Sequence, residues 1–405
     1  MEQNSKYIIS LLLFTGGAAC CYFLSLLAGL PFIVPVLLAA CLLYGLYYFL
    51  FRGQPVLPYN TGKAAAFIFV LSLYYFADNA LRLAAKHGGW DAWAIWNLHA
   101  RYLRSPEHWQ NMFLNTESEH PDYPLCQPAF LAFLIRLAAN HFSLVLTFTF
   151  SLVITLCGPL LIFSELTCKN FIIACIVFLF CAQDIYYIAT GVSQYADTLL
   201  SVFLLAALVT FNHAAENIKY ITVCAALLGF AAFTKNEGVI LASVFLIFYL
   251  RTFCSKKNIK YTLAGLALPV ITVVLFKLKA GVTNDMAASV TSHLAEKLTD
   301  PHRYKLIYDS LINNVNQNFY YTAVFLMLYL LVNTVQQKWP GRQLLLLITC
   351  LMLYMGIYLI TPRDLAWHLE TSQSRLLHQL MPSFIYVIAL QAAGVKINFA
   401  GRFSS

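Results

Sequence analysis

The residues best suited to chemistry are concentrated between Gly88 and Pro128. This stretch holds four of the six tryptophans of the chain together with acids, histidines and arginines, and apolar sequence flanks it on both sides. A long polar loop between apolar segments is a common location for binding and catalytic residues. Asp91, the first acid of the stretch, could take a proton from a hydroxyl group as a general base. It could equally cap a helix, because Asp is a favourable N-cap residue.

A second polar cluster lies between Glu117 and Pro124 and contains His120, Asp122 and Tyr123. An imidazole and a carboxylate this close together could bind a divalent metal ion or polarise a hydroxyl group. The alternative is a polar turn before a membrane segment, which the two prolines of this stretch favour. The sequence leaves metal dependence open.

Further polar residues interrupt the apolar runs later in the chain. An ionisable side chain at membrane depth is costly, so it is by default a candidate for function. Lys235 and Glu237 could simply pair with each other, and an exposed ion pair contributes little to stability. Arg375 offers a planar fork that suits a phosphate group, although a long cation near a membrane boundary can also just extend to the interface. The residues singled out in this way are Tyr195, Asp197, Lys235, Glu237, Arg375 and His378.

The chain that positions these residues is 405 residues long, with 60% hydrophobic and 11% charged residues. A soluble protein has about 25% charged residues, so this composition indicates a membrane protein. A membrane span needs about 20 apolar residues and must be helical, because lipid cannot hydrogen-bond an open backbone. We therefore expect an all-α polytopic membrane protein with about 12 to 13 membrane helices and an extracytoplasmic catalytic loop that carries short interfacial helices.

Twelve apolar runs are candidate membrane helices. The segment Pro124–Asn140 is not counted, because a full crossing there would invert every later loop; we expect it to be re-entrant or to lie in the membrane interface. We treat residues 1–405 as one transmembrane domain with two large extracytoplasmic loops, 86–128 and 280–317. The twelve runs are Tyr7–Ala28, Pro31–Phe51, Lys63–Leu83, Phe142–Phe163, Phe171–Ala189, Thr198–Phe211, Tyr220–Phe233, Val239–Phe253, Tyr261–Leu278, Tyr320–Val335, Leu344–Thr361 and Leu376–Ala393.

The basic residues predict how the chain is oriented. The net charge of +8 is spread over short loops, which is typical of orientation signals and gives no reason to expect a nucleic-acid partner. Loops rich in Lys and Arg tend to lie on the cytoplasmic side. The loops at 52–63, 254–260 and 338–342 and the tail with Lys396 and Arg402 therefore face the cytoplasm. We expect a protein of the inner membrane of the cell with its active site on the extracytoplasmic side.

The order of these motifs resembles the GT-C superfamily of integral-membrane glycosyltransferases, in particular the bacterial branch of protein mannosyltransferases and aminoarabinose transferases. Many relatives carry paired acids in the first loop, whereas Asp91 has no acidic neighbour, and two extra spans precede this loop. No soluble C-terminal domain is expected. The motifs that carry the resemblance are Trp90-Asp91-Ala92-Trp93, His120-Pro121-Asp122-Tyr123-Pro124, Asp197, Thr234-Lys235 and the run from Arg375 to Pro382.

The resemblance implies a sugar donor on a polyprenyl phosphate and an acceptor that is a glycan, a lipid or a protein of the envelope. It implies that Asp91 is the catalytic base and that transfer inverts the anomeric centre. No cofactor is certain, and a divalent metal ion is possible. The donor- and acceptor-binding residues would be His120, Asp122, Tyr123, Tyr195, Asp197, Lys235, Glu237, Arg375 and His378.

Two other classes of membrane protein fit parts of the sequence. A transporter or flippase for a lipid-linked or amphipathic solute could use the same polar residues as a pathway. The predicted gathering of charges at one membrane face favours an enzyme over that alternative. A membrane scaffold for an envelope-assembly complex would explain the apolar runs but not the polar clusters between them.

Overall fold

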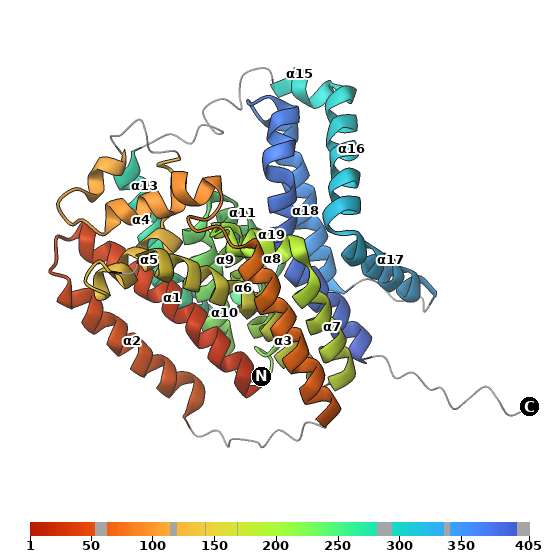
Figure 1. The fold of residues 1–405 in the computed structure, drawn as a ribbon, viewed down its shortest axis with the longest axis horizontal. Helices are drawn as coiled ribbons and strands as arrows, with labels where there is room; N and C mark the ends of the chain where they lie inside the picture. The colour runs from red at the N-terminus through yellow and green to blue at the C-terminus, as the bar shows by residue number, and fades with distance from the viewer. Residues whose placement is uncertain are drawn as a thin grey trace, which may run out of the picture.

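The computed structural model describes residues 1–52, 63–113, 120–141, 143–167, 169–281, 294–335 and 341–394. All regular elements in these ranges are helices (Figure 1), which confirms the all-α class. The predicted loop 280–317 falls partly outside the described residues, as do Glu117, Glu119, Lys338, Lys396 and Arg402.

The described residues form helices in both halves of the chain. The N-terminal half contains α1 (Gln3–Leu27), α2 (Ile33–Phe51), α3 (Lys63–Leu83), the π-helix η1 (Ala92–Trp96), α4 (Asn97–Leu103), the 3-10 helix η2 (Trp109–Phe113), α5 (Cys126–Leu137), α6 (Ser143–Thr167), α7 (Phe171–Gln183), α8 (Ile185–Val192) and α9 (Ala196–Asn212). The C-terminal half contains α10 (Lys219–Thr234), α11 (Asn236–Phe248), α12 (Leu250–Phe253), α13 (Ile259–Ala280), α15 (Leu294–Thr299), α16 (Pro301–Asn318), α17 (Tyr320–Val335), α18 (Arg342–Ile360) and α19 (Leu365–Gly394).

Fewer helices than expected are long and apolar enough to cross a membrane. Among the described residues six qualify, namely α1, α2, α6, α13, α18 and α19, or seven if the bent pair α7 and α8 forms one span. The predicted runs around α9, α10 and α11 are helical but only 13 to 17 residues long. At 1.5 Å per residue they reach about 20 to 26 Å, which is less than the roughly 30 Å of a hydrocarbon core.

One predicted span is broken at a half-buried acid. The run Phe171–Ala189 is divided into α7 and α8, which meet at an angle of 61°. Asp184 lies at the break and accepts a hydrogen bond from the backbone N–H of Tyr187 at 2.8 Å, so it caps α8. An Asp side chain that satisfies the first backbone donors of a helix favours a new start at that point.

The segment that was expected not to cross folds as the short helix α5. It has 12 residues, which corresponds to about 18 Å and is too short for a crossing. Nine of its residues are buried, and it packs against α1, α4 and α6. It therefore lies inside the helix bundle and supports the loop that precedes it.

The centre of the bundle is α9 (Figure 1), in which every residue from Ala196 to Thr210 is buried. It packs against α6, α10 and α19. A helix that is apolar on all sides is typical of such a central position. Its first turn carries Asp197, so this buried central helix holds one of the predicted site residues.

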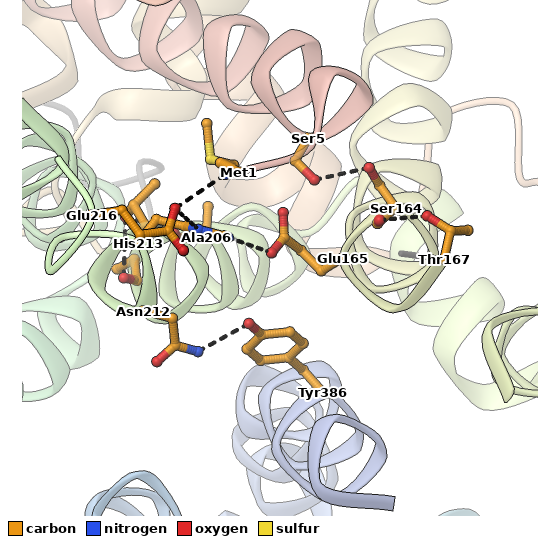
Figure 2. Close-up of polar contacts among 12 residues, drawn as sticks. Met1, Ser5, Ser164, Glu165, Thr167, Ala206, Asn212, His213, Glu216 and Tyr386 are labelled. Carbon is orange, nitrogen blue, oxygen red and sulfur yellow. Dashed lines mark hydrogen bonds and ion pairs between the residues drawn. The ribbon is translucent and has the colours of Figure 1, made fainter. Parts of the chain in front are cut away.

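The far end of α9 is anchored by polar contacts with neighbouring helices (Figure 2). His213 follows α9, and its two ring nitrogens lie 2.7 Å from Glu165 Oε2 on α6 and 3.0 Å from Glu216 Oε2. The Glu216 carboxylate is also 3.5 Å from the amino group of Met1. His213 is about 24 Å along α9 from Asp197, so these contacts fix the helix at the end opposite to that acid.

Candidate active site

A cavity of about 840 Å³ collects almost all of the predicted site residues. It lies where η1, the segment 120–125, the start of α9, the junction of α10 and α11, the end of α18 and the start of α19 come together. The predicted residues that line it are Asp91, His120, Asp122, Tyr123, Tyr195, Asp197, Lys235, Glu237 and Arg375.

Asp91 is placed by a tight turn followed by a π-helix. Gly88 has a φ of +74°, a conformation that favours glycine, and the N–H of Gly89 donates to the carbonyl of Ser193 at 3.0 Å. Asp91 then precedes η1, and π-helical turns are frequent at functional sites. Its carboxylate makes no capping hydrogen bond. The interpretation of Asp91 as a helix cap is therefore wrong.

The carboxylate of Asp91 is paired with Arg375 of α19, which is 284 positions away in the sequence. Arg375 Nη1 donates to Asp91 Oδ2 in a charge-assisted hydrogen bond. The same guanidinium lies 5.3 Å from the centre of the Tyr195 ring. Its Nε atom is buried without an acceptor, so Arg375 keeps one unused donor.

Lys235 is the centre of a second, more deeply buried charge cluster. Lys235 Nζ donates to Asp197 Oδ1 at 2.9 Å and lies 3.4 Å from Glu237 Oε1. Burial lowers the pKa of Lys235, but the two carboxylates outweigh this effect and raise the pKa above its ordinary value. Gln379 of α19 also donates to Asp197 Oδ1. Asp197 Oδ2 and Glu237 Oε2 are buried without a donor, so the cluster has two unused acceptors.

The close approach of α10 and α11 turns Lys235 inward. Lys235 has an extended backbone between the two helices, with φ −151° and ψ 160°. Gly238, in the first turn of α11, leaves room for this sharp junction, because a Cβ atom there would lie 1.9 Å from the backbone oxygen of Ala231. Contact with backbone cannot be relieved by a side-chain rotation. Only glycine therefore allows this geometry at position 238.

Aromatic rings cover Lys235 on its other side. Trp96 and Tyr123 are stacked with their ring centres 5.7 Å apart, and Lys235 Nζ is 5.9 Å from each of the two ring centres. Cations are attracted to aromatic faces at this distance. His120 stacks on Tyr123 with ring centres 4.5 Å apart. Burial raises the pKa of Tyr123, so its hydroxyl group is protonated and can donate a hydrogen bond.

Asp122 belongs to a polar network with residues that are distant in the sequence. Its side chain accepts a hydrogen bond from Asn236 Nδ2 at 2.9 Å. Lys277 of α13 donates to the backbone oxygen of Asp122 at 2.7 Å and to Asn236 Oδ1 at 2.8 Å. The sequence gives little indication of this contact, because Asn236 is 41 positions before Lys277, which lies in the last turn of α13. The network holds the segment 120–125 against α11 and α13.

His378 is the one predicted site residue that does not line the cavity. It is fully buried, and its Nε2 atom lies 3.0 Å from Thr198 Oγ1. The position is almost one helical turn beyond Arg375 on α19. His378 thus makes a contact between α9 and α19 outside the cavity lining, and substrate binding by His378 stays a prediction.

The described residues contain no group of three or more His, Cys, Asp or Glu side chains that could hold a metal ion. The carboxylate of Asp122, a candidate ligand by sequence, is bonded to Asn236 instead. Its His120 neighbour stacks on Tyr123. The carboxylates and imidazoles of the described cavity therefore take part in ion pairs, hydrogen bonds and ring contacts, and they do not form a metal-ligand cluster.

Comparison with known proteins finds no matching family model, no similar curated protein and no similar solved structure.

Proposed function

We propose that this protein is a membrane glycosyltransferase that moves a sugar from a polyprenyl phosphate to an envelope acceptor, which is a glycan, a lipid or a protein. The observation that carries the proposal is the composition of the cavity. It combines an accessible acid, Asp91, with buried acceptors and a buried donor that have no partner within the described protein. A ligand rich in hydroxyl groups satisfies such atoms, and unsatisfied buried polar atoms are otherwise costly.

In this proposal Asp91 is the general base. Arg375 binds Oδ2 and orients the carboxylate, so Oδ1 can accept the proton of the acceptor hydroxyl group. The acceptor oxygen then forms a bond to the anomeric carbon, while the bond between that carbon and the lipid phosphate oxygen breaks. The electron pair leaves with the phosphate. Attack in line with the departing group inverts the anomeric centre.

The buried cluster would recognise the sugar. Asp197 Oδ2 and Glu237 Oε2 can each accept a hydrogen bond from a sugar hydroxyl, and Arg375 Nε can donate one. Tyr123 and Tyr195 add aromatic surface to the same wall. Lys235 neutralises the two acids and keeps them in fixed positions.

Sidedness is part of the proposal, with the cavity facing outward and the basic loop 254–260 facing the cytoplasm. In sealed cells, Trp90→Cys should react with a membrane-impermeant maleimide, because Trp90 is exposed beside Asp91. Lys257→Cys should react only after permeabilisation. The parent protein, which contains the exposed Cys41 and Cys254, gives the background. Reaction of position 257 but not of position 90 in sealed cells would contradict this orientation.

The proposed activity is tested with purified protein, a radiolabelled polyprenyl-phosphate sugar and an extract of envelope acceptors. Transfer of the label from the lipid to an acceptor, without a membrane gradient, is the expected result. A transporter or flippase would instead move the intact donor across vesicle membranes without consuming it. Movement without transfer would reject the enzyme and support that alternative.

A further inference from the structure

We propose that Arg363, stacked on Trp367, receives the phosphate group of the ligand, so that the ligand enters the cavity with its anionic end at this wall and its sugar at Asp197 and Glu237. This inference rests on the proposed function. It assigns the phosphate to a residue other than Arg375, which the sequence had favoured.

In the inner half of the cavity, formed by Asp91, Asp197, Lys235, Glu237 and Arg375, the positive charges already have acidic partners. Arg375 is paired with Asp91, and Lys235 is paired with Asp197 and Glu237. A phosphate placed there would meet three carboxylates at short range. Like charges at such distances repel strongly in a partly buried site. The inner half therefore suits hydroxyl groups better than an anion.

Arg363 is the cation of the cavity that has no acidic partner within the described residues. It lies in the turn between α18 and α19, and its backbone N–H donates to Thr361 Oγ1 at 3.3 Å. The neighbouring acid, Asp364, accepts a hydrogen bond from the N–H of Trp367 at 2.8 Å and thus serves the start of α19. The guanidinium of Arg363 can therefore pair with the negative charge of a ligand.

The guanidinium of Arg363 is presented in a suitable orientation. Its Cζ atom lies 5.6 Å from the centre of the Trp367 ring. An arginine supported by an aromatic ring keeps its planar fork available for two hydrogen bonds to phosphate oxygens. Trp367 is 49% exposed, and exposed tryptophans are enriched at the membrane–water interface, the depth of a lipid phosphate.

An apolar path for the lipid begins next to Arg363. Ile357 and Ile360 of α18 line the cavity, and Ile360 is three residues before Arg363. Leu353 lies one turn earlier on the same side of α18 and is exposed. The phosphate at Arg363 would therefore continue into an isoprenoid chain along α18. This path favours a lipid-linked phosphate over a free one.

The test is a binding measurement with the full chain in lipid nanodiscs, with undecaprenyl phosphate as the probe. Arg363→Ala should weaken binding by about 10- to 100-fold, as expected for loss of charged hydrogen bonds. Arg363→Lys should restore only part of the affinity, because lysine has no planar fork. The matched control is Arg82→Ala, because Arg82 is exposed, pairs with Asp78 and does not line the cavity. A variant is compared with the parent only if the two proteins have the same unfolding temperature.

Two further probes identify the source of the phosphate. Undecaprenol, which lacks the phosphate, should bind the parent and Arg363→Ala equally and weakly. Inorganic phosphate should compete only at much higher concentration than the lipid. Competition by inorganic phosphate at the same concentration would show that the site binds free phosphate and would overturn the lipid assignment.

The inference and the proposed function fail in different ways. Unchanged affinity of Arg363→Ala for undecaprenyl phosphate, with loss of affinity in Arg375→Ala, would place the phosphate at Arg375 and reject the inference. Sugar transfer by the parent would still support the enzyme. An Arg363-dependent affinity without any sugar transfer would retain the phosphate site and reject the glycosyltransferase.

Discussion

Asp91→Asn is expected to slow sugar transfer by about 100- to 10,000-fold, the usual cost of losing a positioned general base. An amide cannot take up the proton of the acceptor hydroxyl group. Its oxygen can still accept the hydrogen bond that Arg375 donates to Asp91 in the parent. The unfolding temperature should therefore fall only slightly. The measurement is the rate of transfer from a polyprenyl-phosphate sugar at matched amounts of folded protein.

Asp78→Asn is the control for this experiment. Asp78 is also paired with an arginine, Arg82 at 2.9 Å, but neither residue lines the cavity. The control variant should transfer sugar at the parent rate. If Asp91→Asn also transfers within a few-fold of the parent, Asp91 is not the base, and Asp122 and Asp197 become the candidates among the described residues.

Lys235→Met is expected to destabilise the protein by about 3 to 5 kcal/mol, as is typical when one partner of a buried ion pair is removed. Lys235 is 5% exposed and Asp197 is fully buried, so water cannot replace the lost ammonium group. The carboxylate of Asp197 would remain in the bundle with Gln379 as its one donor among the described residues. Chemical unfolding in detergent, followed by the loss of helical signal, measures the change.

A double variant separates the unpaired charge from the loss of packing. Lys235→Met combined with Asp197→Asn should lose less stability than the sum of the two single changes, because the fully buried Asp197 no longer carries an unpaired charge. Lys257→Met, at an exposed position, should change the free energy of unfolding by less than about 0.5 kcal/mol. Equal stability of Lys235→Met and the parent would show that the pair with Asp197 contributes nothing.

The sequence by itself determined the class of protein and most of the ionisable residues that line the cavity. A chain with 60% hydrophobic residues can bury its backbone in an apolar environment only as helices, whatever its tertiary arrangement. Charges are rare in such a chain and costly to bury, so the exceptions stand out without any knowledge of packing. Asp91, Asp197, Lys235 and Arg375 were recognisable for that reason, and all four line one cavity.

Only the tertiary structure decided which of these charges meet. Asp91 and Arg375 are paired across 284 positions, because helix packing and not sequence distance sets the neighbours of a side chain. The same packing buries His378 and brings Lys277 to the backbone oxygen of Asp122. It also leaves Arg363 beside Trp367, without an acidic partner among the described residues. The tertiary structure also decided the lengths of several helices. The break at Asp184 and the short helices α9 to α11 depend on caps and close contacts, which an apolar run does not reveal.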